Sequence, residues 1–398
     1  MSLPPWITLQ IGAREHYAIP RALHERGALA GLLTDLWLPP GSALAALPSL
    51  QRLRDRWHPQ LGDAPVWAPT KRQLLAEARL ALLGRRRGWP GILDRNLSFQ
   101  RGVARRLHGL QRQLPPQTVL FAYSYAARLP LAVARAQGWR TVLGQIDPGP
   151  EEERIVAAER RRYPDLATGW QPAPASYWQQ WRQELDLAER VLVNSSWSRR
   201  CLLQAGVPAA KLRTVPLIYQ APSTAPIQAR PSLPGAAFQL LFLGSINLRK
   251  GVARLLEAMR LLEGAPIQLT LAGPTEIDPV SWADRPNIRW IGAVPRSRVG
   301  ELYAAADALV LPTLSDGFAL TQLEALAHGC PVIASRFCGD VVTPGCNGWL
   351  LPALEPEILA ATFREAAETA ILLPRPLPCP AFGMEQLADA LLQLFNPV

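Results

Sequence analysis

Short, mostly apolar runs recur along this chain between stretches of helical periodicity, and this alternation is the strongest constraint on its fold. The runs in the N-terminal half are Trp6–Ile11, Val119–Ala122, Thr141–Leu143, Arg190–Val193 and Leu212–Val215. Those in the C-terminal half are Leu240–Leu243, Ile267–Ala272, Ile288–Ile291, Ala308–Leu311 and Val332–Ala334. Apolar strands separated by helices are typical of parallel sheets covered on both faces. The pattern predicts an α/β protein with two doubly wound, Rossmann-like sheets.

The length and one unpatterned segment divide the chain into two domains. A chain of 398 residues exceeds what one hydrophobic core usually fills. Residues 220–237 are rich in Pro, Ser and Ala and lack periodicity, which is typical of a linker. We therefore expect an N-terminal domain at residues 1–219 and a C-terminal domain at residues 238–382. Residues 383–398 carry a helical pattern after a Pro-rich stretch, and we expect this helix to cross back onto the first domain.

Composition narrows the class of protein. A formal charge of +10 favours an anionic partner, which leaves nucleic acid, a lipid surface and phosphate-bearing substrates open. The five Cys form no CxxC pair and have no His at metal-ligand spacing, so we expect a reduced, cytoplasmic protein without a metal site. No apolar run reaches about 18 residues and no secretory leader pattern opens the chain, which predicts neither a membrane span nor secretion.

The segment Ser315–Val332, SDGFALTQLEALAHGCPV, follows the expected strand at residues 308–311. We expect a helix to open at Asp316, at the carboxyl edge of a parallel strand, where backbone N–H groups and the helix dipole favour a diphosphate. Asp316 and Glu324 can then point at one ligand, since carboxylates accept paired hydrogen bonds from the vicinal hydroxyls of ribose and hexoses. The alternative is that Asp316 only caps the helix and Glu324 lies on a solvated face.

A second segment, Gly244–Gly251 with the sequence GSINLRKG, connects the strand at residues 240–243 to a helix. Arg249 and Lys250 stand at the helix entrance, where Arg offers a fork and Lys a point charge to phosphate oxygens. The Walker A spacing is absent, which argues against ATP hydrolysis of that type. Taken alone, such a basic pair also fits a solvated helix face.

Together the two segments resemble the donor site of glycosyltransferase family 4. The similarity continues through AGP at Ala272–Pro274, IGAVP at Ile291–Pro295, ADALVLPT at Ala306–Thr313 and the segment ending LEALAHGCPVIAS. Upstream, residues Leu187–Leu217 resemble the segment that closes the family's first domain. Several motifs in this order are more specific than any one of them.

The resemblance implies a GT-B fold, in which two facing Rossmann-like domains bind the donor mainly in the second and the acceptor in the first. It implies that Glu324 contacts the nucleotide ribose and that Arg249 and Lys250 neutralise the diphosphate. Asp316 and the backbone after it are expected to face the donor sugar. The expected donor-binding residues are Gly244, Arg249, Lys250, Phe318, Ala319, Leu320 and Glu324, with Gly12 from the first domain.

Retention of the anomeric configuration is expected, because family members retain it. Cations that neutralise a departing diphosphate stabilise the transition state without a metal. We therefore expect neither a metal nor a cofactor besides the nucleotide-sugar co-substrate. Two positions depart from the family: Asp316 stands where Glu is common, which bears on sugar choice, and Ser245 stands where many members have a phosphate-binding Arg. Arg249 is the candidate replacement for that Arg.

In the N-terminal half, the segment IGAREHYAIPRALHERG stands where family members place a loop near the donor phosphates and the acceptor. Gly12 is the candidate donor contact, and Arg14, His16 and Tyr17 are the candidate acceptor-side residues. The alternative is a loop and an amphipathic helix with incidental polar residues. Asp147 stands where the family often has a sugar-contacting polar residue. The candidate catalytic residues are Asp316, Lys250, Arg249 and Asp147.

Residues 71–112 concentrate the positive charge, with Arg and Lys greatly outnumbering Glu77 and Asp94. An apolar helical face accompanies them at Leu74, Leu75, Ala78, Leu82 and Leu83. This pattern is typical of helices that lie on anionic lipid. The alternative is a solvated helix that covers its own core. Nucleic acid is not an expected partner, because no recognised nucleic-acid module accompanies the charge.

The favoured function is the retaining transfer of a sugar from a nucleotide-diphosphate donor to a saccharide or lipid-linked acceptor, at the cytosolic face of a membrane. One alternative is a GT-B enzyme of another reaction type, an epimerase or a phosphorylase. No recognisable cofactor-lysine segment supports the phosphorylase. The other alternative is a non-catalytic sugar-nucleotide-binding protein that keeps the pocket without turnover.

Overall fold

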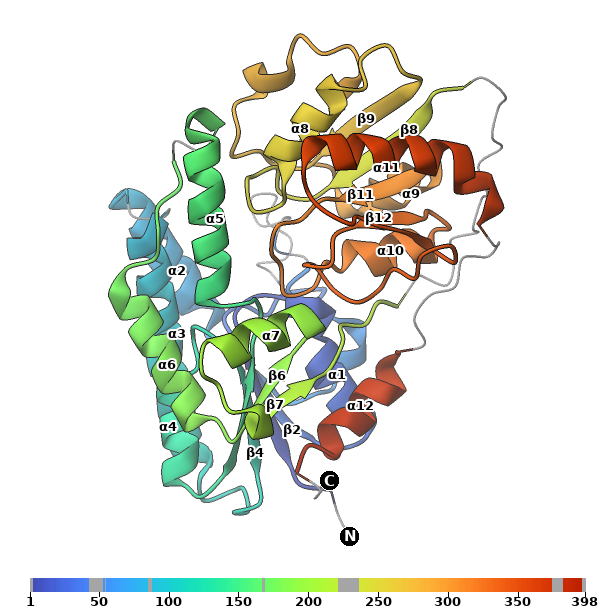
Figure 1. The fold of residues 1–398 in the computed structure, drawn as a ribbon. Coiled ribbons are helices and arrows are strands. Elements are labelled where there is room, and N and C mark those ends of the chain that lie inside the picture. Colours follow the sequence, from blue (N-terminus) through green and yellow to red (C-terminus); the bar gives the residue numbers. More distant parts are fainter. Residues whose placement is uncertain are drawn as a thin grey trace.

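The computed structural model describes residues 3–42, 53, 55–84, 88–166, 169–220, 236–373 and 382–395. Figure 1 shows two α/β units, one above the other, each with helices packed around a central sheet. All strand pairs in both sheets are parallel. The predicted α/β class with two parallel sheets is therefore confirmed.

The first sheet has the order β3-β2-β1-β4-β5-β6-β7. Its strands are β1 (Trp6–Gln10), β2 (Leu29–Thr34), β3 (Val66–Trp67), β4 (Val119–Tyr123), β5 (Arg140–Gly144), β6 (Arg190–Val193) and β7 (Leu212–Thr214). The five strands predicted in this half are confirmed. β2 and β3 were not predicted, because Gly31 interrupts the apolar run of β2 and β3 spans only two residues.

Helices cover both faces of this sheet, as a doubly wound fold requires. They are α1 (Ala18–Glu25), α2 (Thr70–Leu82), α3 (Gly88–Leu110), α4 (Arg128–Ala136), α5 (Pro150–Arg162), α6 (Ala175–Leu187) and α7 (Ser196–Gln204). One core cluster joins the sheet to α1, through residues such as Leu23, and to the C-terminal helix, through residues such as Leu387. A second cluster joins the other face to α3, α4, α6 and α7, and includes Val103 and Trp181.

The second sheet has the order β10-β9-β8-β11-β12-β13. Its strands are β8 (Phe238–Leu243), β9 (Ile267–Ala272), β10 (Ile288–Trp290), β11 (Ala308–Leu311), β12 (Val332–Ala334) and β13 (Gly348–Leu350). Its helices are α8 (Val252–Arg260), α9 (Val299–Ala305), α10 (Thr321–Ala327) and α11 (Pro356–Thr369). The five strands predicted in this half are confirmed, and only the three-residue β13 was not predicted.

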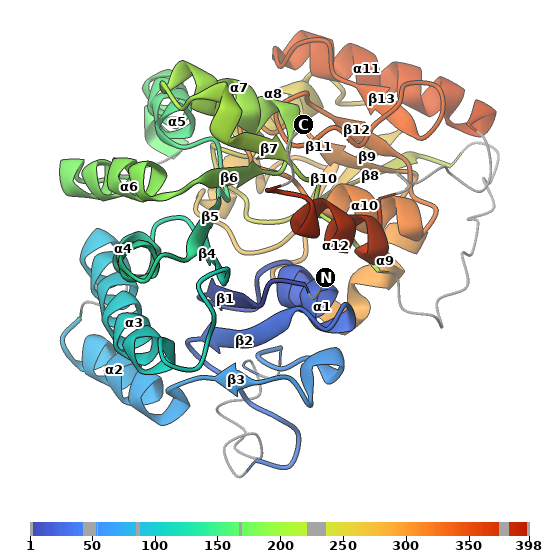
Figure 2. The same ribbon diagram turned by 90° about the horizontal axis from the view of Figure 1, so that it is seen from below.

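The C-terminal helix α12 (Met384–Leu392) returns to the first unit and lies beside α1 (Figure 2). Arg26 Nη2 donates to Asp389 Oδ1 at 2.8 Å, and Leu387 and Leu391 are buried in the shared core. The predicted crossing-back helix is thus confirmed. The expected linker and the Pro-rich stretch before α12 lie mostly outside the described residues, and the exact domain boundaries remain a prediction.

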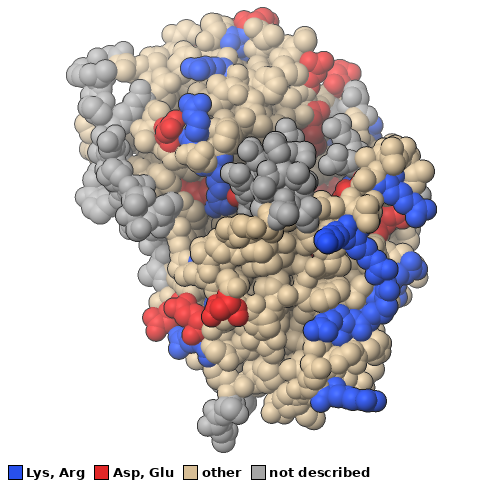
Figure 3. All heavy atoms as spheres, turned by 180° about the vertical axis from the view of Figure 1, so that it is seen from behind, with Lys and Arg blue, Asp and Glu red and all other residues tan. Residues whose placement is uncertain are grey.

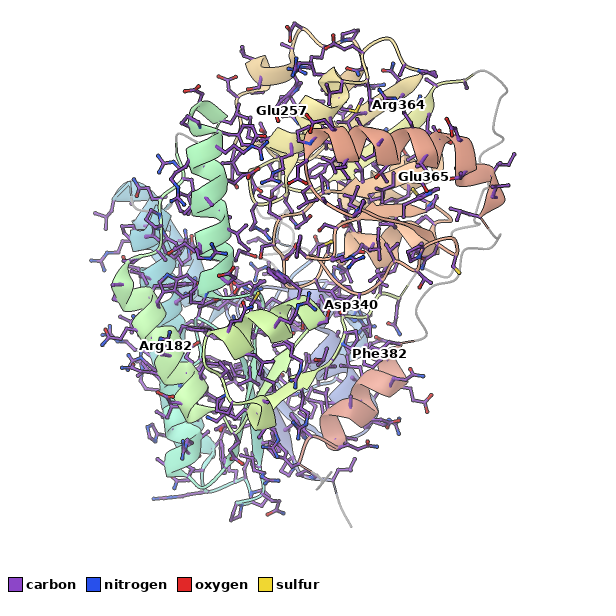
Figure 4. All side chains as sticks on the ribbon, in the orientation of Figure 1. Arg182, Glu257, Asp340, Arg364, Glu365 and Phe382 are labelled. Atoms are coloured by element: carbon purple, nitrogen blue, oxygen red, sulfur yellow. The ribbon has the colours of Figure 1, made fainter. Side chains whose placement is uncertain are left out.

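The two units contact each other through α5, which rises from the first unit to lie against α8 (Figure 1). The guanidinium of Arg254 on α8 donates two hydrogen bonds of 2.7 Å to the buried carboxylate of Glu159 on α5. Tyr163 Oη donates to Glu257, labelled on α8 in Figure 4, at 2.7 Å. α5 therefore connects the two units through hydrogen bonds to α8. Within the described parts of the chain, no helix is both long and apolar enough to cross a bilayer.

Candidate active site

The carboxyl ends of the two sheets meet where the segment after β5 touches the segment after β11. A Cβ atom added to Gly317 would lie 2.2 Å from the carbonyl oxygen of Ile146, so only glycine allows this approach. Ser195 Oγ donates to Gly317 O at 2.8 Å. Nearby, Asp340 accepts hydrogen bonds of 2.7 Å from both the N–H and the hydroxyl of Ser196 at the start of α7 (Figure 4). The candidate residues of the two halves are thereby brought together.

Arg249 and Lys250 reach this junction through the loop after β8. Gly251 closes the loop with a φ of +73°, and a Cβ atom there would lie 1.9 Å from the carbonyl oxygen of Pro312 after β11. Asn247 Oδ1 accepts from the N–H of Lys250 at 3.1 Å, which fixes the turn before α8. The close approach of Gly251 to Pro312 therefore places both cations beside the end of β11.

Asp316 is held by both of these cations. Lys250 Nζ pairs with Asp316 Oδ2, and Arg249 Nη1 lies 3.4 Å from Asp316 Oδ1 while donating to the carbonyl oxygen of Ser315 at 3.1 Å. Burial alone would raise the pKa of Asp316, but Lys250 and Arg249 outweigh it and hold the pKa below its ordinary value. The structure thus brings Arg249, Lys250 and Asp316 together, while their roles towards a donor remain predictions.

The position of Asp316 relative to a helix was predicted wrongly. α10 begins at Thr321, and residues 315–320 form a loop. Asp316 is therefore not at a helix N-terminus, and it is positioned by ion pairs rather than by a helix dipole. The alternative that it caps the helix is also excluded, since the N-cap residue is Leu320.

Glu152 of α5 enters the cluster from the N-terminal half, and sequence reasoning missed it. Its Oε1 lies 3.7 Å from Arg249 Nε. Burial raises the pKa of Glu152 to about 8, with Arg249 opposing the rise and Asp147 and Asp316 adding to it. Burial therefore favours the protonated form of Glu152. The only signal for Glu152 in the sequence was an acidic run at residues 151–153, and the sequence does not show which of these carboxyl groups lies near Arg249.

Asp147 lies in the same cluster, partly buried on the segment after β5. Its Oδ1 accepts from Tyr125 Oη at 2.5 Å, from Gln145 Nε2 at 3.1 Å and from the N–H of Gly149 at 2.8 Å. Burial raises the pKa of Asp147, although these hydrogen bonds and the charge of Arg249 oppose the rise. The structure thus brings all four candidate catalytic residues together.

A cavity of about 170 Å³ adjoins Asp147 on the side of the N-terminal sheet. Arg14, Tyr123, Tyr125 and Tyr177 contribute to its lining, and the rings of Tyr125 and Tyr177 stack with centroids 4.7 Å apart. Aromatic walls with a few polar groups are typical of small-molecule pockets.

Strained backbone lies at Tyr125, which lines this cavity, and at the three residues that directly follow Arg14 of its lining. Glu15, His16 and Tyr17 have consecutive φ values of 50°, 52° and 60°, and Tyr125 has a φ of 73°. Within the described residues these four are the only non-glycine positions with positive φ. Each such residue costs on the order of 1 to 2 kcal/mol, and conformations of this kind cluster at functional sites.

The predicted acceptor-side residues separate in the structure. Arg14 lines the cavity. His16 instead contacts Arg296 of the other half, with nitrogen–nitrogen distances of 2.7 and 2.5 Å, and burial together with Arg296 lowers the pKa of His16 to about 4. Tyr17 is 1% exposed and packs edge-on against Trp37, so its prediction as an acceptor-side residue is corrected: its ring belongs to the core.

The backbone N–H of Gly12 is hydrogen-bonded within the N-terminal half. Its N–H donates to Asp35 Oδ1 at 2.9 Å, and Asp35 is held by Arg56 Nη1 at 2.9 Å. Asp35 and Arg56 were not identified from sequence, because they lie far along the chain from Gly12. A donor contact through the Gly12 N–H would have to displace this hydrogen bond.

The remaining donor-side candidates lie on the two loops that carry Arg249, Lys250 and Asp316 and on the helix α10 that follows Asp316. Glu324 on α10 accepts from Tyr303 Oη at 3.0 Å, and Gly244 directly follows β8. Phe318, Ala319 and Leu320 lie on the loop between Asp316 and α10, where the Ala319 N–H is already bonded to the carbonyl oxygen of Cys338 at 2.7 Å. The roles of these residues towards a donor remain predictions. Within the described residues, no group of three or more His, Cys, Asp or Glu is placed to hold a metal ion.

Comparison with known proteins identifies relatives of this architecture. Residues 237–369 match the family described as Glycosyl transferases group 1. The chain is 29% identical over 270 residues to the D-inositol 3-phosphate glycosyltransferase of Kineococcus radiotolerans, covering 58% of this chain and 62% of that protein. It is 30% identical over 176 residues to the O-antigen chain mannosyltransferase B of Escherichia coli, covering 39% and 45%. The matches thus span less than two thirds of these relatives.

Solved structures show the same fold over nearly the whole chain. The lipopolysaccharide outer core galactosyltransferase WaaB has a TM-score of 0.61 at 12% identity, with 98% of this chain and 99% of that chain covered. HepE of Anabaena, solved in complex with UDP, has a TM-score of 0.58 at 16% identity, with 98% and 94% covered. The predicted GT-B fold is confirmed.

Proposed function

We propose that this chain transfers a sugar from a nucleotide-diphosphate sugar to a saccharide or glycolipid acceptor, because residues 237–369 match the group 1 glycosyltransferases and the chain has the GT-B fold. The observation that carries this proposal is the cluster of Arg249, Lys250 and Asp316 where the carboxyl ends of the two sheets meet. Open parallel sheets bind ligands at that edge. The UDP complex of HepE supports a nucleoside diphosphate as the leaving group.

Charge explains how the cluster would hold a diphosphate. Arg249 and Lys250 share one close carboxylate, Asp316, whereas Asp147 is held by its own hydrogen bonds and burial disfavours the charged form of Glu152. A diphosphate would take over the pairing with both cations, and Asp316 would then be released to the hydroxyls of the donor sugar. Glu324, held by Tyr303, would bind the ribose.

The same cations would act during bond cleavage. As the bond between the anomeric carbon and the diphosphate oxygen lengthens, negative charge grows on the diphosphate, and fixed cations stabilise that charge without a metal. The acceptor would occupy the cavity beside Asp147, between the Tyr125 ring and Arg14. Retention of anomeric configuration and metal independence are parts of this proposal.

A lipid-linked acceptor would be reached from the cytosolic face of a membrane. On and just after α2, Leu75, Leu82 and Leu83 are 72%, 89% and 57% exposed, and no residue of α2 is buried. Figure 3 shows Lys and Arg side chains along the edge of the molecule formed by α2 and α3. Exposed leucines among cations fit an anionic bilayer better than a helix that covers its own core. Residues 85–87, part of the predicted basic run, lie outside the described residues.

A donor-panel assay tests the proposed reaction. UDP-, GDP- and ADP-sugars are each incubated with the protein and a saccharide mixture, in the presence and absence of a chelator. We expect one donor to be consumed equally in both conditions and to yield a product whose anomeric proton signal has the donor's configuration. Nucleotide binding without sugar transfer or release would favour the non-catalytic alternative, and a donor returned with an inverted hydroxyl would favour an epimerase.

Vesicle co-sedimentation tests the membrane contact separately. Replacing Leu75 and Leu82 by Ser removes exposed apolar surface without changing charge, so we expect binding to anionic vesicles to weaken. The matched control is Val280 and Ile371 to Ser, which removes exposed apolar side chains from the other half. Equal binding by both variants and the unmodified protein would exclude an interfacial role for α2.

A further inference from the structure

A second cavity lies in the N-terminal half, between α2 and α3, outside the candidate active site. Its volume is about 290 Å³, and its lining includes Trp67, Arg72, Gln73, Gly102, Arg105 and Arg106. It opens at the carboxyl end of the edge strand β3, whose last residue is Trp67. The only residue that it shares with the cavity beside Asp147 is Phe99, so the two are separate spaces on either side of α3.

The arginines of this second cavity have no carboxylate partners among the described residues. No carboxylate of the described residues forms an ion pair with Arg72, Arg105 or Arg106. The nearby acid of α2, Glu77, is already paired with Arg95 of α3, whose Nε lies 2.5 Å from Glu77 Oε1. The three residues are exposed, so water and salt weaken the repulsion between their guanidinium groups, but together they give the cavity a positive potential that favours an anion.

The shape of the cavity matches the chemistry of a phosphate group. Arginine presents a planar fork of donors that bonds two phosphate oxygens at once. Gln73 adds an amide donor, and Trp67 forms an apolar wall. Gly102 of α3 lines the cavity opposite Trp67, and a Cβ atom there would lie 3.6 Å from the Trp67 ring, so a larger side chain would occupy the space between them.

We propose that this cavity is a binding site for a phosphate group, with Arg72 on α2 and Arg105 and Arg106 on α3 as its ligands. Leu75 lies one helical turn from Arg72 and is exposed, so the headgroup phosphate of an anionic lipid has access to the cavity where α2 meets a bilayer. A free phosphate or diphosphate has the same chemistry and is distinguished by the test. The site requires no sugar transfer, so its failure and that of the proposed reaction are separable.

The test compares two double variants of equal charge. Arg72→Gln with Arg106→Gln removes two cations from the cavity, whereas Arg79→Gln with Arg112→Gln removes two cations outside it. Calorimetric titration with inorganic phosphate and with pyrophosphate at low salt is one arm. Co-sedimentation with phosphatidylglycerol vesicles, against phosphatidylcholine vesicles, is the other. We expect at least about tenfold weaker binding for the cavity variant and nearly unchanged binding for its control.

A third variant, Gly102→Leu, fills the cavity without changing charge and adds a better helix former. It should weaken binding as the cavity double variant does, and a retained melting temperature shows that folding is intact. Loss confined to the vesicle arm identifies a lipid headgroup, and loss confined to the free anions identifies a soluble phosphate. Equal losses in both double variants, unchanged binding by Gly102→Leu, or no binding of any probe would overturn the proposal.

Discussion

The two halves of the molecule hold their residues of the candidate active site in place in different ways. In the C-terminal half, Arg249, Lys250 and Asp316 are held by one another, on loops that directly follow neighbouring strands. In the N-terminal half, Gly12 is bonded to Asp35, and the Glu15–Tyr17 turn has a left-handed backbone with the His16 N–H bonded to the carbonyl oxygen of Ala13. The C-terminal side of the candidate site is organised by charge, and the N-terminal side by strained backbone and distant packing.

This difference indicates what each half contributes. A charge cluster that is already assembled needs little rearrangement to accept a diphosphate, which favours electrostatic stabilisation. A strained turn is maintained by its surroundings and responds to changes in them. His16 on that turn contacts Arg296 of the other half, so the shape of the turn is tied to the relative position of the two halves.

The largest expected effect comes from breaking the donor-side cluster. Lys250→Ala should lower turnover by about 100- to 1000-fold, because the growing charge on the diphosphate loses one of its two cations. Steady-state kinetics with the accepted donor measures the loss. The matched control is Arg260→Ala, an exposed cation at the end of the same helix, which should leave turnover unchanged. Unchanged turnover in Lys250→Ala would remove the diphosphate role.

The brace between the halves is the next test. Arg254→Ala leaves the buried carboxylate of Glu159, 3% exposed, without its ion-pair partner, and should reduce the free energy of unfolding by about 3 kcal/mol. Chemical denaturation measures the change. Arg364 on α11, labelled in Figure 4, provides the exposed control when replaced by Ala. Equal stability of the two variants would mean that α5 does not brace the halves in solution.

Ribose recognition should respond more moderately. Glu324→Ala removes hydrogen bonds from a charged acceptor and should weaken binding of the preferred nucleoside diphosphate by about tenfold to a hundredfold. Calorimetry with UDP, GDP and ADP measures the affinity. Glu365 on α11, labelled in Figure 4, is the exposed acid for the control substitution. If both variants bind as the unmodified protein does, Glu324 has no role in the donor site.

The smallest expected effect is a change in the pH dependence of turnover and stability when Glu152 of the N-terminal half, which lies beside Arg249 of the C-terminal half, is replaced. Because the pKa of Glu152 is about 8, turnover should fall as pH rises through 8, when the new carboxylate offsets Arg249. The folded state keeps a proton that the unfolded state, with a pKa of 4.5, releases, so this group makes stability decrease between pH 4.5 and 8. Glu152→Gln should flatten both profiles, and an unaltered alkaline limb would assign that limb to another group.

Much of the fold was predictable because its signals are local. The run Ala308–Leu311 is apolar and short and is followed by a turn, which identifies a buried strand without any tertiary information. The start of α10 was predicted too early, because distant residues hold residues 315–320 in a loop. The N–H of Asp316, for example, donates to the carbonyl oxygen of Phe337. Tyr17 was assigned to the wrong environment for the same kind of reason, since Trp37 covers it.

By itself, the sequence determined the two parallel sheets, the returning helix and the set of cations and acids at the ends of β8 and β11, because apolar runs and strand–loop–helix order are properties of neighbouring residues. Only the tertiary structure decided that Glu152 and Asp147 face Arg249, that Tyr17 is buried, and that three arginines of α2 and α3 share one cavity. Those outcomes depend on which helix faces meet across the sheets, and burial and charge act between residues far apart in the chain.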